Sequence, residues 1–234
     1  MQLEQITKIL EKFAPLETQE KWDNSGLQIE ADKDINKILI CLTITDDIIK
    51  QATDGDFDLI ISHHPLFFVP FSIKKNFSIY SMHTNFDKAS GGTTDTLINT
   101  LGFNYNKAQK IEDFLRIITL DKKIPLSDFI KNLKEKLNLK KINVVNNFSK
   151  KDVQKIAFCS GSGADFTNLA ESNFADILVT GDIKFHAALD SKIILADAGH
   201  FETEYPSLKV IKELLQDLGL EVVIADEKSP FTVY

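Results

Sequence analysis

Two adjacent histidines that follow an apolar run are the residues in this sequence best placed to do chemistry. His63 and His64 come directly after Asp58-Leu-Ile-Ile-Ser62 and directly before Pro65. An unbroken apolar run is typical of a parallel strand that is buried on both faces. Proline cannot donate a hydrogen bond to a sheet, and it disfavours helical geometry in the residue before it. We therefore expect both histidines in an extended turn at the carboxyl end of a strand, where α/β sheets bind ligands.

The adjacent histidines have a metal-binding interpretation and a simpler one. Consecutive side chains point in different directions, so this pair suits two neighbouring metal ions better than one shared ion. The alternative is that either residue is an ordinary polar member of a loop, because histidine has many roles in proteins. Both interpretations of any single histidine stay open at this point.

Carboxylates recur four residues after two other histidines. Asp87 follows His83, and Glu204 follows His200, while the fifth histidine, His186, lies near another predicted strand end. Positions i and i+4 share a helix face, so one ion can bind to both members of such a pair. Zinc, iron, nickel and manganese accept mixed imidazole and carboxylate ligands, and two such ions would lie about 3.5–4 Å apart. The structural alternative is that Asp87 caps the helix that starts near Gly91, and that Glu204 is an acidic residue stabilised by the dipole of the following helix.

The elements that must position these residues alternate between strand and helix patterns. Apolar runs predict strands at 35–42, 58–62, 79–84, 113–120, 140–145 and 192–196, and helical periodicity predicts helices at 2–14, 46–53, 91–101 and 126–137. Strands that alternate with helices are typical of an α/β fold with parallel strand pairs.

Part of the chain is repeated. Residues 34–41 and 58–62 each match a segment that lies 118 residues later, and the intervening lengths are equal. This pattern predicts a duplicated strand-helix-strand unit with right-handed crossovers. At the same offset His64 corresponds to Asp182, so we expect two related lobes with a metal site between them at the strand carboxyl ends. The alternative is that two similar units share only a hydrophobic pattern.

The repeat and a change in composition suggest three parts. Residues 1–112 are predicted to form a first α/β lobe with the His-His motif, and 148–234 a second lobe that repeats it. The intervening residues, 113–147, are rich in lysine, lack histidine and read as a small strand-helix-strand segment. A polar stretch near residue 147 marks the second boundary.

Composition and charge exclude several classes of protein. The chain has 234 residues, 43% of them hydrophobic, and its net charge of −7 argues against nucleic acid or an anionic membrane as its main partner. No apolar run approaches the roughly 20 residues that span a bilayer. The first residues form an amphipathic helix pattern instead of a signal peptide, so we expect a cytoplasmic protein. Cys41 and Cys159 each end an apolar run, which argues against a disulfide framework or a thiolate zinc site.

A glycine-containing segment, Ser160-Gly161-Ser162-Gly163-Ala164-Asp165, follows a strand pattern and opens a helix pattern. Such an arrangement can present backbone donors to a phosphate group. The alternative is a tight turn, because glycine permits backbone conformations that other residues avoid. The segment matches neither a Walker loop nor a complete dinucleotide fingerprint.

Together the motifs resemble those of a known family. They are His63-His64-Pro65, the 83–87 segment with Gly91-Gly92, the 180–186 segment, the 199–204 segment and the early Trp22-Asp23-Asn24-Ser25-Gly26-Leu27-Gln28. In this order and over nearly the whole chain, they resemble the Nif-three-like dinuclear metal-centre family, whose bacterial members are often labelled GTP cyclohydrolase I type 2 homologues. This chain is similar to the short form, which has no inserted middle domain.

The resemblance implies a site and an assembly. It implies two divalent metal ions, of zinc, iron, manganese or nickel, held by five ligands: His63, His64, Asp87, His200 and Glu204. It also implies a toroidal homohexamer with the metal sites facing an inner cavity. His83 and His186 match family positions near the metal ions, and they are the candidates for contact with substrate or for catalysis.

The function implied by the resemblance is metal-dependent hydrolysis. The named candidate is a GTP cyclohydrolase-type reaction on a small-molecule substrate, which opens the imidazole ring of a guanine nucleotide and releases formate. Five protein ligands leave positions vacant on two ions, and this count favours an enzyme. The alternative is a non-catalytic, metal-binding hexameric scaffold or interaction protein.

Overall fold

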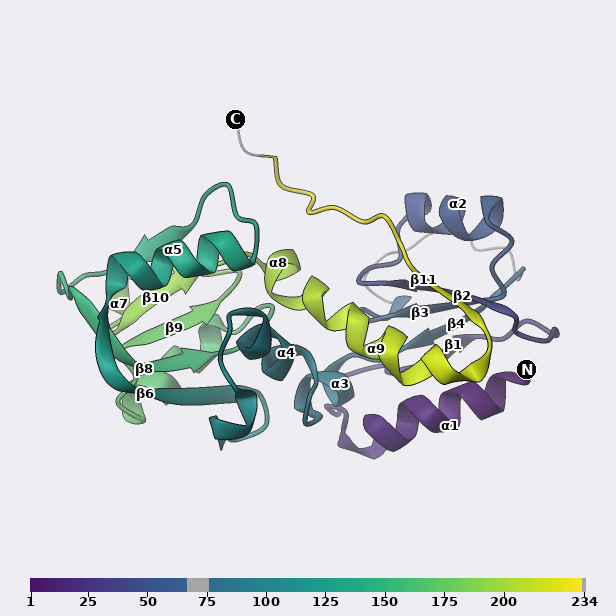
Figure 1. Ribbon diagram of the computed structural model, residues 1–234, viewed down its shortest axis with the longest axis horizontal. Helices are drawn as coiled ribbons and strands as arrows, with labels where there is room; N and C mark the ends of the chain where they lie inside the picture. Colours follow the sequence, from purple (N-terminus) through teal and green to yellow (C-terminus); the bar gives the residue numbers. More distant parts are fainter. Residues whose placement is uncertain (67–75, 233–234) are drawn as a thin grey trace. The chain divides into compact units, whose positions relative to one another are not determined.

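The structure is a computed structural model that describes residues 1–66 and 76–232, and the chain divides into two compact units (Figure 1). The first unit contains Met1–Gly92 and Ser207–Lys228. The second contains Thr93–Pro206 and residues 229–232. The sequence predicted three parts, divided at 112 and 147. In the structure the 113–147 segment is part of the second unit, because its longest strand pairs with a strand of the later lobe.

The first unit is built on a five-stranded sheet with the order β1-β4-β3-β2-β11. The bounds of these strands are Gly26–Ile29 for β1, Ser78–Ser81 for β4, Leu59–Ser62 for β3, Lys37–Cys41 for β2 and Glu221–Ile224 for β11. The four strands from β4 to β11 are parallel, and β1 is antiparallel to β4. Every residue of β3 is buried, as expected for a parallel strand covered on both faces.

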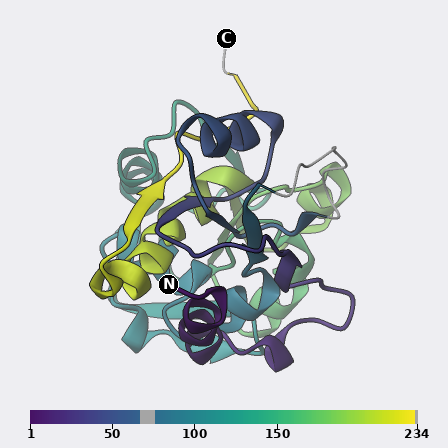
Figure 2. The ribbon, with the colours of Figure 1, turned by 90° about the vertical axis from the view of Figure 1, so that its right-hand side faces the viewer.

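Helices cover both faces of this sheet. The unit contains α1 (Leu3–Phe13), α2 (Asp46–Asp54), α3 (Thr84–Lys88) and α9 (Leu208–Leu215), with short 3₁₀ turns at Leu16–Thr18 and Gln216–Leu218. Figure 2 shows α2 on one side of the sheet and α1 on the other. Alternate residues of a strand point to opposite faces. In β2, Leu39 therefore packs in the core cluster that contains Ile48 of α2.

The second unit is built on a six-stranded sheet with the order β5-β6-β8-β9-β10-β7. The bounds are Gln109–Ile111 for β5, Leu115–Pro125 for β6, Asp152–Phe158 for β8, Ile177–Thr180 for β9, Ile194–Asp197 for β10 and Asn143–Val145 for β7. Strands β8, β9 and β10 are parallel, and antiparallel strands flank them on both sides. The result is a mixed sheet.

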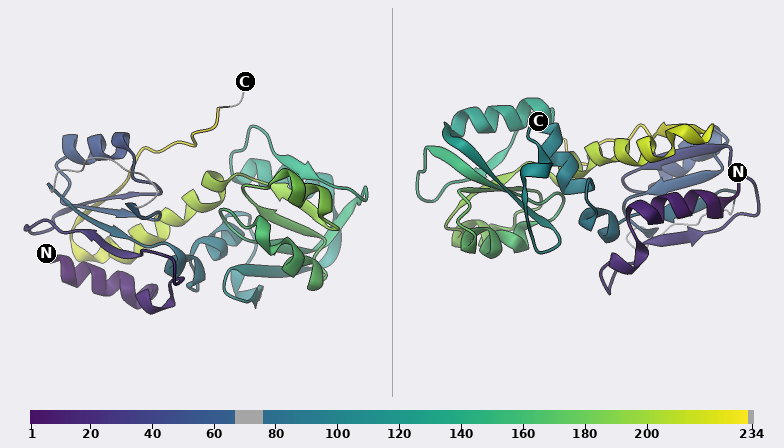
Figure 3. Two further views of the ribbon diagram at one scale, coloured as in Figure 1. Left: turned by 180° about the vertical axis from the view of Figure 1, so that it is seen from behind. Right: turned by 60° about the horizontal axis from the view of Figure 1, so that its bottom comes forward.

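The helices of the second unit also lie on two faces, and each face has its own core. The α-helices are α4 (Thr93–Thr100), α5 (Leu126–Lys136), α6 (Thr167–Ser172), α7 (Phe185–Asp190) and α8 (His200–Glu204), and 3₁₀ turns occupy Tyr105–Lys107, Ala164–Phe166 and Tyr205–Ser207. In the right panel of Figure 3, α5 lies on one side of the sheet and the green helices α6 and α7 on the other. Phe129 of α5 packs in one apolar cluster, and Ala170 of α6 packs in the other. The predicted α/β class is confirmed.

The central strand pairs of the two units have the same register. In the first unit Ile38 of β2 lies opposite Leu59 of β3. In the second, Ile156 of β8 lies opposite Ile177 of β9, and both residues are displaced by 118 from their counterparts. The next strand in each unit, β4 or β10, is followed within three residues by a five-residue helix, α3 or α8. An origin by duplication stays a prediction, which this repeated register supports.

Candidate metal centre

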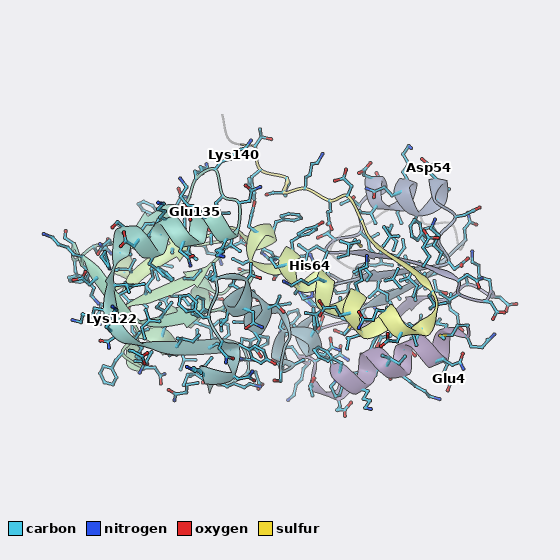
Figure 4. The ribbon with its side chains drawn as sticks, viewed as in Figure 1. Glu4, Asp54, His64, Lys122, Glu135 and Lys140 are labelled. Carbon is cyan, nitrogen blue, oxygen red and sulfur yellow. The ribbon has the colours of Figure 1, made fainter. Side chains whose placement is uncertain are left out.

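The two adjacent histidines continue directly from the carboxyl end of β3. The backbone N–H of His63 donates to the Cys41 carbonyl at 3.1 Å, and that of His64 donates to the Leu42 carbonyl at 2.9 Å. These hydrogen bonds extend the pairing of β3 with β2 beyond the strands and place both side chains at the end of the sheet. His63 is fully buried. His64, labelled in Figure 4, is partly exposed.

A third imidazole joins this pair. The ring centroid of His83 lies 5.1 Å from that of His63 and 5.6 Å from that of His64, and the two adjacent rings are 4.9 Å apart. Each ring offers one nitrogen to a group whose members lie within 4.8 Å of one another, a separation that a single metal ion can span. The sequence predicted His83 as a candidate for catalysis. The structure places it among the histidines predicted to bind metal.

The orientation of two of these rings is fixed through Nδ1. His63 Nδ1 lies 2.7 Å from the Met82 carbonyl oxygen, and His83 Nδ1 lies 2.8 Å from Asp23 Oδ1. A carbonyl or carboxylate oxygen can only accept, so Nδ1 must carry the proton in both rings. In the neutral form of each ring the lone pair is then on Nε2. Metal-binding histidines commonly have this arrangement, which fixes the tautomer and raises the basicity of the ligand nitrogen.

The ring of His64 is held by contacts that involve Thr43 and, through the backbone, Glu227 near the end of the first unit. His64 Nδ1 lies 2.7 Å from Thr43 Oγ1. The Glu227 carboxylate in turn accepts hydrogen bonds from the backbone N–H groups of Leu42 and Thr43, at 2.6 and 2.8 Å. Burial raises the pKa of Glu227, and the two backbone hydrogen bonds partly oppose that rise. Glu227 thus shapes the loop that positions His64.

Asp87 is the carboxylate of the first unit that lies beside His63 Nε2. It lies on α3, and its Oδ1 is 3.6 Å from His63 Nε2. Because His63 Nε2 carries a lone pair in the neutral ring, two electron-rich atoms lie close together. A divalent cation between such atoms would be stabilised by both. His63 and Asp87 therefore fit the donor set that the sequence predicted.

The second unit contains the other predicted pair. His200 and Glu204 are the first and last residues of α8, and His200 Nε2 lies 3.0 Å from Glu204 Oε2. His200 Nδ1 lies 2.6 Å from Asp182 Oδ2. Burial lowers the pKa of His200, but the Glu204 and Asp182 carboxylates outweigh burial and raise the pKa to about 10. The predicted i, i+4 relation is present, and the imidazole lies between two carboxylates, as a metal-binding histidine often does.

The glycine segment makes room for Glu204. Gly161 has a φ of +65°, and a Cβ atom there would lie 1.9 Å from Glu204 Oε1. Its N–H donates to Thr203 Oγ1 at 2.9 Å, and the N–H of Gly163 donates to Thr180 Oγ1 at 2.8 Å. These two donors are engaged within the protein, so they are not presented to a phosphate group. The segment is a turn that fits closely around a predicted metal ligand.

His186 differs from the other histidines. It is exposed on α7, and its ring lies 5.6 Å from that of Phe185. Within residues 1–66 and 76–232, none of the possible metal-binding groups includes it. Its role as a catalytic candidate stays a prediction.

Sequence reasoning did not assign a role to Asp23. Its side chain is fully buried, and burial alone would raise the pKa of Asp23. Hydrogen bonds from His83 and Thr84 outweigh burial and hold that pKa well below its usual value. The sequence signal was the Trp22-Asp23-Asn24-Ser25 motif, which by itself indicated only a turn and a resemblance. Asp182 had a clearer signal, because the repeat relates it to His64.

The described residues define a mixed α/β protein with imidazole and carboxylate groups that could bind a metal ion. None of the helices in the described ranges is long and apolar enough to cross a membrane. The chain belongs to the Duf34/NIF3 (NGG1p interacting factor 3) family, whose family model matches residues 1–230. This confirms the resemblance on which the predicted ligands were based.

Relatives of similar length support the assignment. A Clostridium perfringens protein named GTP cyclohydrolase 1 type 2 homolog is 33% identical over 99% of both chains. A Campylobacter jejuni protein with the same name is 34% identical over the whole of both chains. The crystal structure of a Staphylococcus aureus hypothetical protein is similar over all of this chain and 99% of that one, with a TM-score of 0.86 and 25% sequence identity.

Proposed function

We propose that the chain is a hydrolase that depends on two divalent metal ions. The proposed ligands are His63, His64, Asp87, His200 and Glu204. The observation that carries this proposal is the pairing of imidazole nitrogens with carboxylate oxygens inside each unit. His63 Nε2 faces Asp87 Oδ1 at 3.6 Å, and His200 Nε2 faces Glu204 Oε2 at 3.0 Å. A role in helix capping or at a helix dipole would explain the presence of one carboxylate at a time. Metal binding explains why each carboxylate lies beside a histidine.

The chemistry proposed for the metal ions and that of the protein groups complement each other. Bound divalent ions polarise a substrate and make hydroxide available near neutral pH by lowering the pKa of water. Asp87 and Glu204 supply negative charge that balances the ions, and the fixed rings of His63 and His200 give the site a defined geometry. His83 carries its lone pair on Nε2, so it can accept a proton and return it to a leaving group. His186 is the other candidate for this role.

The proposed substrate is a guanine nucleotide such as GTP. The relatives named GTP cyclohydrolase 1 type 2 homolog support this substrate class, since they match this chain over nearly its full length. In the proposed reaction the imidazole ring of guanine is opened by hydrolysis, and the ring carbon leaves as formate. Hydrolysis of a phosphoester is a closely related variant for the same kind of centre.

Formate release from GTP tests the proposal. The purified protein would be stripped with a chelator and compared with the same protein reloaded with zinc, manganese or iron. We expect release only after reloading, and none from a reloaded Glu204→Ala variant. No release from wild-type protein that carries two ions by elemental analysis would reject GTP as the substrate.

A second candidate function is a non-catalytic metal-binding scaffold. The family description, NGG1p interacting factor 3, refers to an interaction between proteins and favours this alternative. In this case the metal ions would stabilise an assembly, proposed to be a toroidal homohexamer. Sedimentation of metal-free and metal-loaded protein, combined with the formate assay, distinguishes the two candidates. A scaffold predicts that the hexamer depends on metal, and an enzyme predicts turnover whatever the effect of metal on assembly.

A further inference from the structure

We infer that Asp23 is the positioning residue for His83, and that it determines which nitrogen of His83 faces the other two imidazoles. Asp23 Oδ1 lies 2.8 Å from His83 Nδ1. Nδ1 therefore carries the proton, and Nε2 is the nitrogen that His83 offers to the group it forms with His63 and His64. No sequence pattern assigned this role to Asp23.

The surroundings of Asp23 hold its carboxylate in one orientation. Its oxygens accept hydrogen bonds from the Asn24 N–H at 2.7 Å and the Ser25 hydroxyl at 2.9 Å. They also accept from the Thr84 N–H at 3.0 Å and the Thr84 hydroxyl at 2.5 Å. The side chain is fully buried. A buried carboxylate with this many donors cannot rotate without losing several charge-assisted hydrogen bonds, so the acceptor for His83 is fixed in place.

The same turn also holds the backbone of His83. The His83 N–H donates to Ser25 Oγ at 3.2 Å, and Ser25 Oγ in turn donates to Asp23. Both the ring and the main chain of His83 are thus fixed by residues about 60 positions earlier in the sequence. The hydrogen bond from Thr84, the first residue of α3, extends this control to the helix that carries Asp87. One buried carboxylate therefore positions elements of the site that follow β4.

The chemical consequence concerns the tautomer of His83. A carboxylate that accepts from Nδ1 leaves the lone pair on Nε2. An asparagine at position 23 can turn its NH₂ group toward His83. Nδ1 must then accept, and Nε2 carries the proton. The nitrogen facing His63 and His64 would change from an acceptor to a donor, although the shape of the side chain is conserved.

The test is the tautomer of His83 in Asp23→Asn, measured by ¹⁵N NMR of the imidazoles on metal-free protein. We expect Nδ1–H in the wild type and Nε2–H in the variant, with the His83 signals assigned by their loss in His83→Ala. Asp182→Asn is the matched control, since it alters the carboxylate beside His200 and should leave the His83 signals unchanged. A folded Asp23→Asn variant with the wild-type tautomer would overturn the inference.

The wild-type protein supplies a second measurement, which does not depend on the folding of a variant. A hydrogen bond to a buried carboxylate should give the His83 Nδ1 proton a downfield, slowly exchanging ¹H signal. Absence of that signal from wild-type protein overturns the inference as well.

The catalytic consequence rests on the proposed hydrolase, whereas the tautomer does not. If the proposed function holds, Asp23→Asn should lower kcat by about 10- to 100-fold at saturating metal, with KM unchanged. Asp23→Asn in a His83→Ala background should then cause no further loss. A reversed tautomer without turnover in the wild type would reject the hydrolase and leave the role of Asp23 intact. An additional loss in the double variant would reject the positioning role in catalysis.

Discussion

Asp58 and Asp176 lie 118 residues apart and perform the same structural role in the two units. Asp58 Oδ2 accepts hydrogen bonds from two consecutive backbone N–H groups, those of residues 36–37, at 2.8 and 3.0 Å. Asp176 Oδ2 accepts from residues 154–155, both at 2.9 Å. Each carboxylate directly precedes one parallel strand and binds the chain at its parallel neighbour. These two residues therefore help to set the register that places the site residues at the strand ends.

Replacement of either carboxylate should destabilise its own unit. Asp58→Ala or Asp176→Ala removes two hydrogen bonds to an ionised group, and we expect a loss of about 1–3 kcal/mol in the free energy of unfolding. Urea denaturation followed by circular dichroism measures the loss. Asp54→Ala is the control, because Asp54 is an exposed residue whose ion pair with Lys50 should contribute little. A loss no greater than that of the control would contradict the proposed role.

The contribution of Asp58 should depend on pH. Burial raises the pKa of Asp58, but hydrogen bonds from Lys33 and from the backbone at 36–37 outweigh burial and lower the pKa below 3.8. Because the folded-state pKa is the lower one, the stabilisation is present above about pH 4 and is lost as pH falls through the folded-state value. The stability difference between wild type and Asp58→Asn should be constant from pH 7 to about 5 and should shrink below about 4. A stability difference that becomes larger below about pH 4 would contradict the expected direction of this pH dependence.

Removal of a proposed ligand should lower bound metal without unfolding the protein. Glu204→Ala and His64→Ala each remove one donor from the proposed centre, and elemental analysis after reloading should show a reduced metal content. Circular dichroism should remain that of the wild type. His186→Ala is the control, because His186 is exposed and the possible metal-binding groups among the described residues do not include it. Full occupancy in both ligand variants would reject the assignment.

Gly161 should be essential for the position of Glu204. Gly161→Ala would place Cβ 1.9 Å from Glu204 Oε1 and must displace that carboxylate. We expect bound metal to fall as it does in Glu204→Ala. Gly102→Ala is a close control, because Gly102 also has a positive φ, +89°, but nothing lies within 4 Å of its added Cβ. If the Gly161→Ala and Gly102→Ala variants bind equal amounts of metal, the contact with Glu204 has no effect of its own on metal binding. Any loss that both variants share would then come from backbone strain.

Thr43 should support His64 as a ligand. Thr43→Val removes the hydroxyl that lies 2.7 Å from His64 Nδ1 while the size of the side chain is kept. Loss of such a partner typically lowers metal affinity by about 10- to 100-fold, and a competition titration with a chelating dye would measure it. Glu227→Gln should have a similar but smaller effect through the loop. Thr7→Val is the control, because the Thr7 hydroxyl donates to the Glu4 carbonyl of its own helix. An unchanged metal affinity in Thr43→Val would show that the Thr43 hydroxyl does not assist metal binding by His64.

The strand ends and the paired spacings could be predicted from sequence because they depend on local patterns. The unbroken apolar run before His63 reports burial on both faces, and Pro65 shows where pairing ends. The spacing of His200 and Glu204 needs only the pitch of one helical turn. The 118-residue repeat predicted a duplicated strand-helix-strand unit, and the shared register of the two strand pairs supports that prediction. None of these inferences required knowledge of which distant segments meet.

The remaining contacts join residues that are far apart in the sequence. His83 and Asp23 are 60 residues apart, and Leu42 and Glu227 are 185 apart. The sequence presented Asp23 only as part of a turn, and it gave Glu227 no role. Gly161 illustrates the same limit, since its local pattern allowed a phosphate site or a turn. The turn is favoured because the Gly161 and Gly163 N–H groups donate to Thr203 and Thr180, which are distant in the sequence.

The sequence by itself determined the α/β class, the family, and the positions of the histidines after β3 and at the start of α8. These follow from periodicity and chain breaks, which act over a few residues. Only the tertiary structure decided that His83 lies beside His63 and His64, with Nδ1 fixed by Asp23. Hydrogen-bond partners of a ring depend on which distant segments pack together. The side-chain pattern within any one segment does not specify that packing.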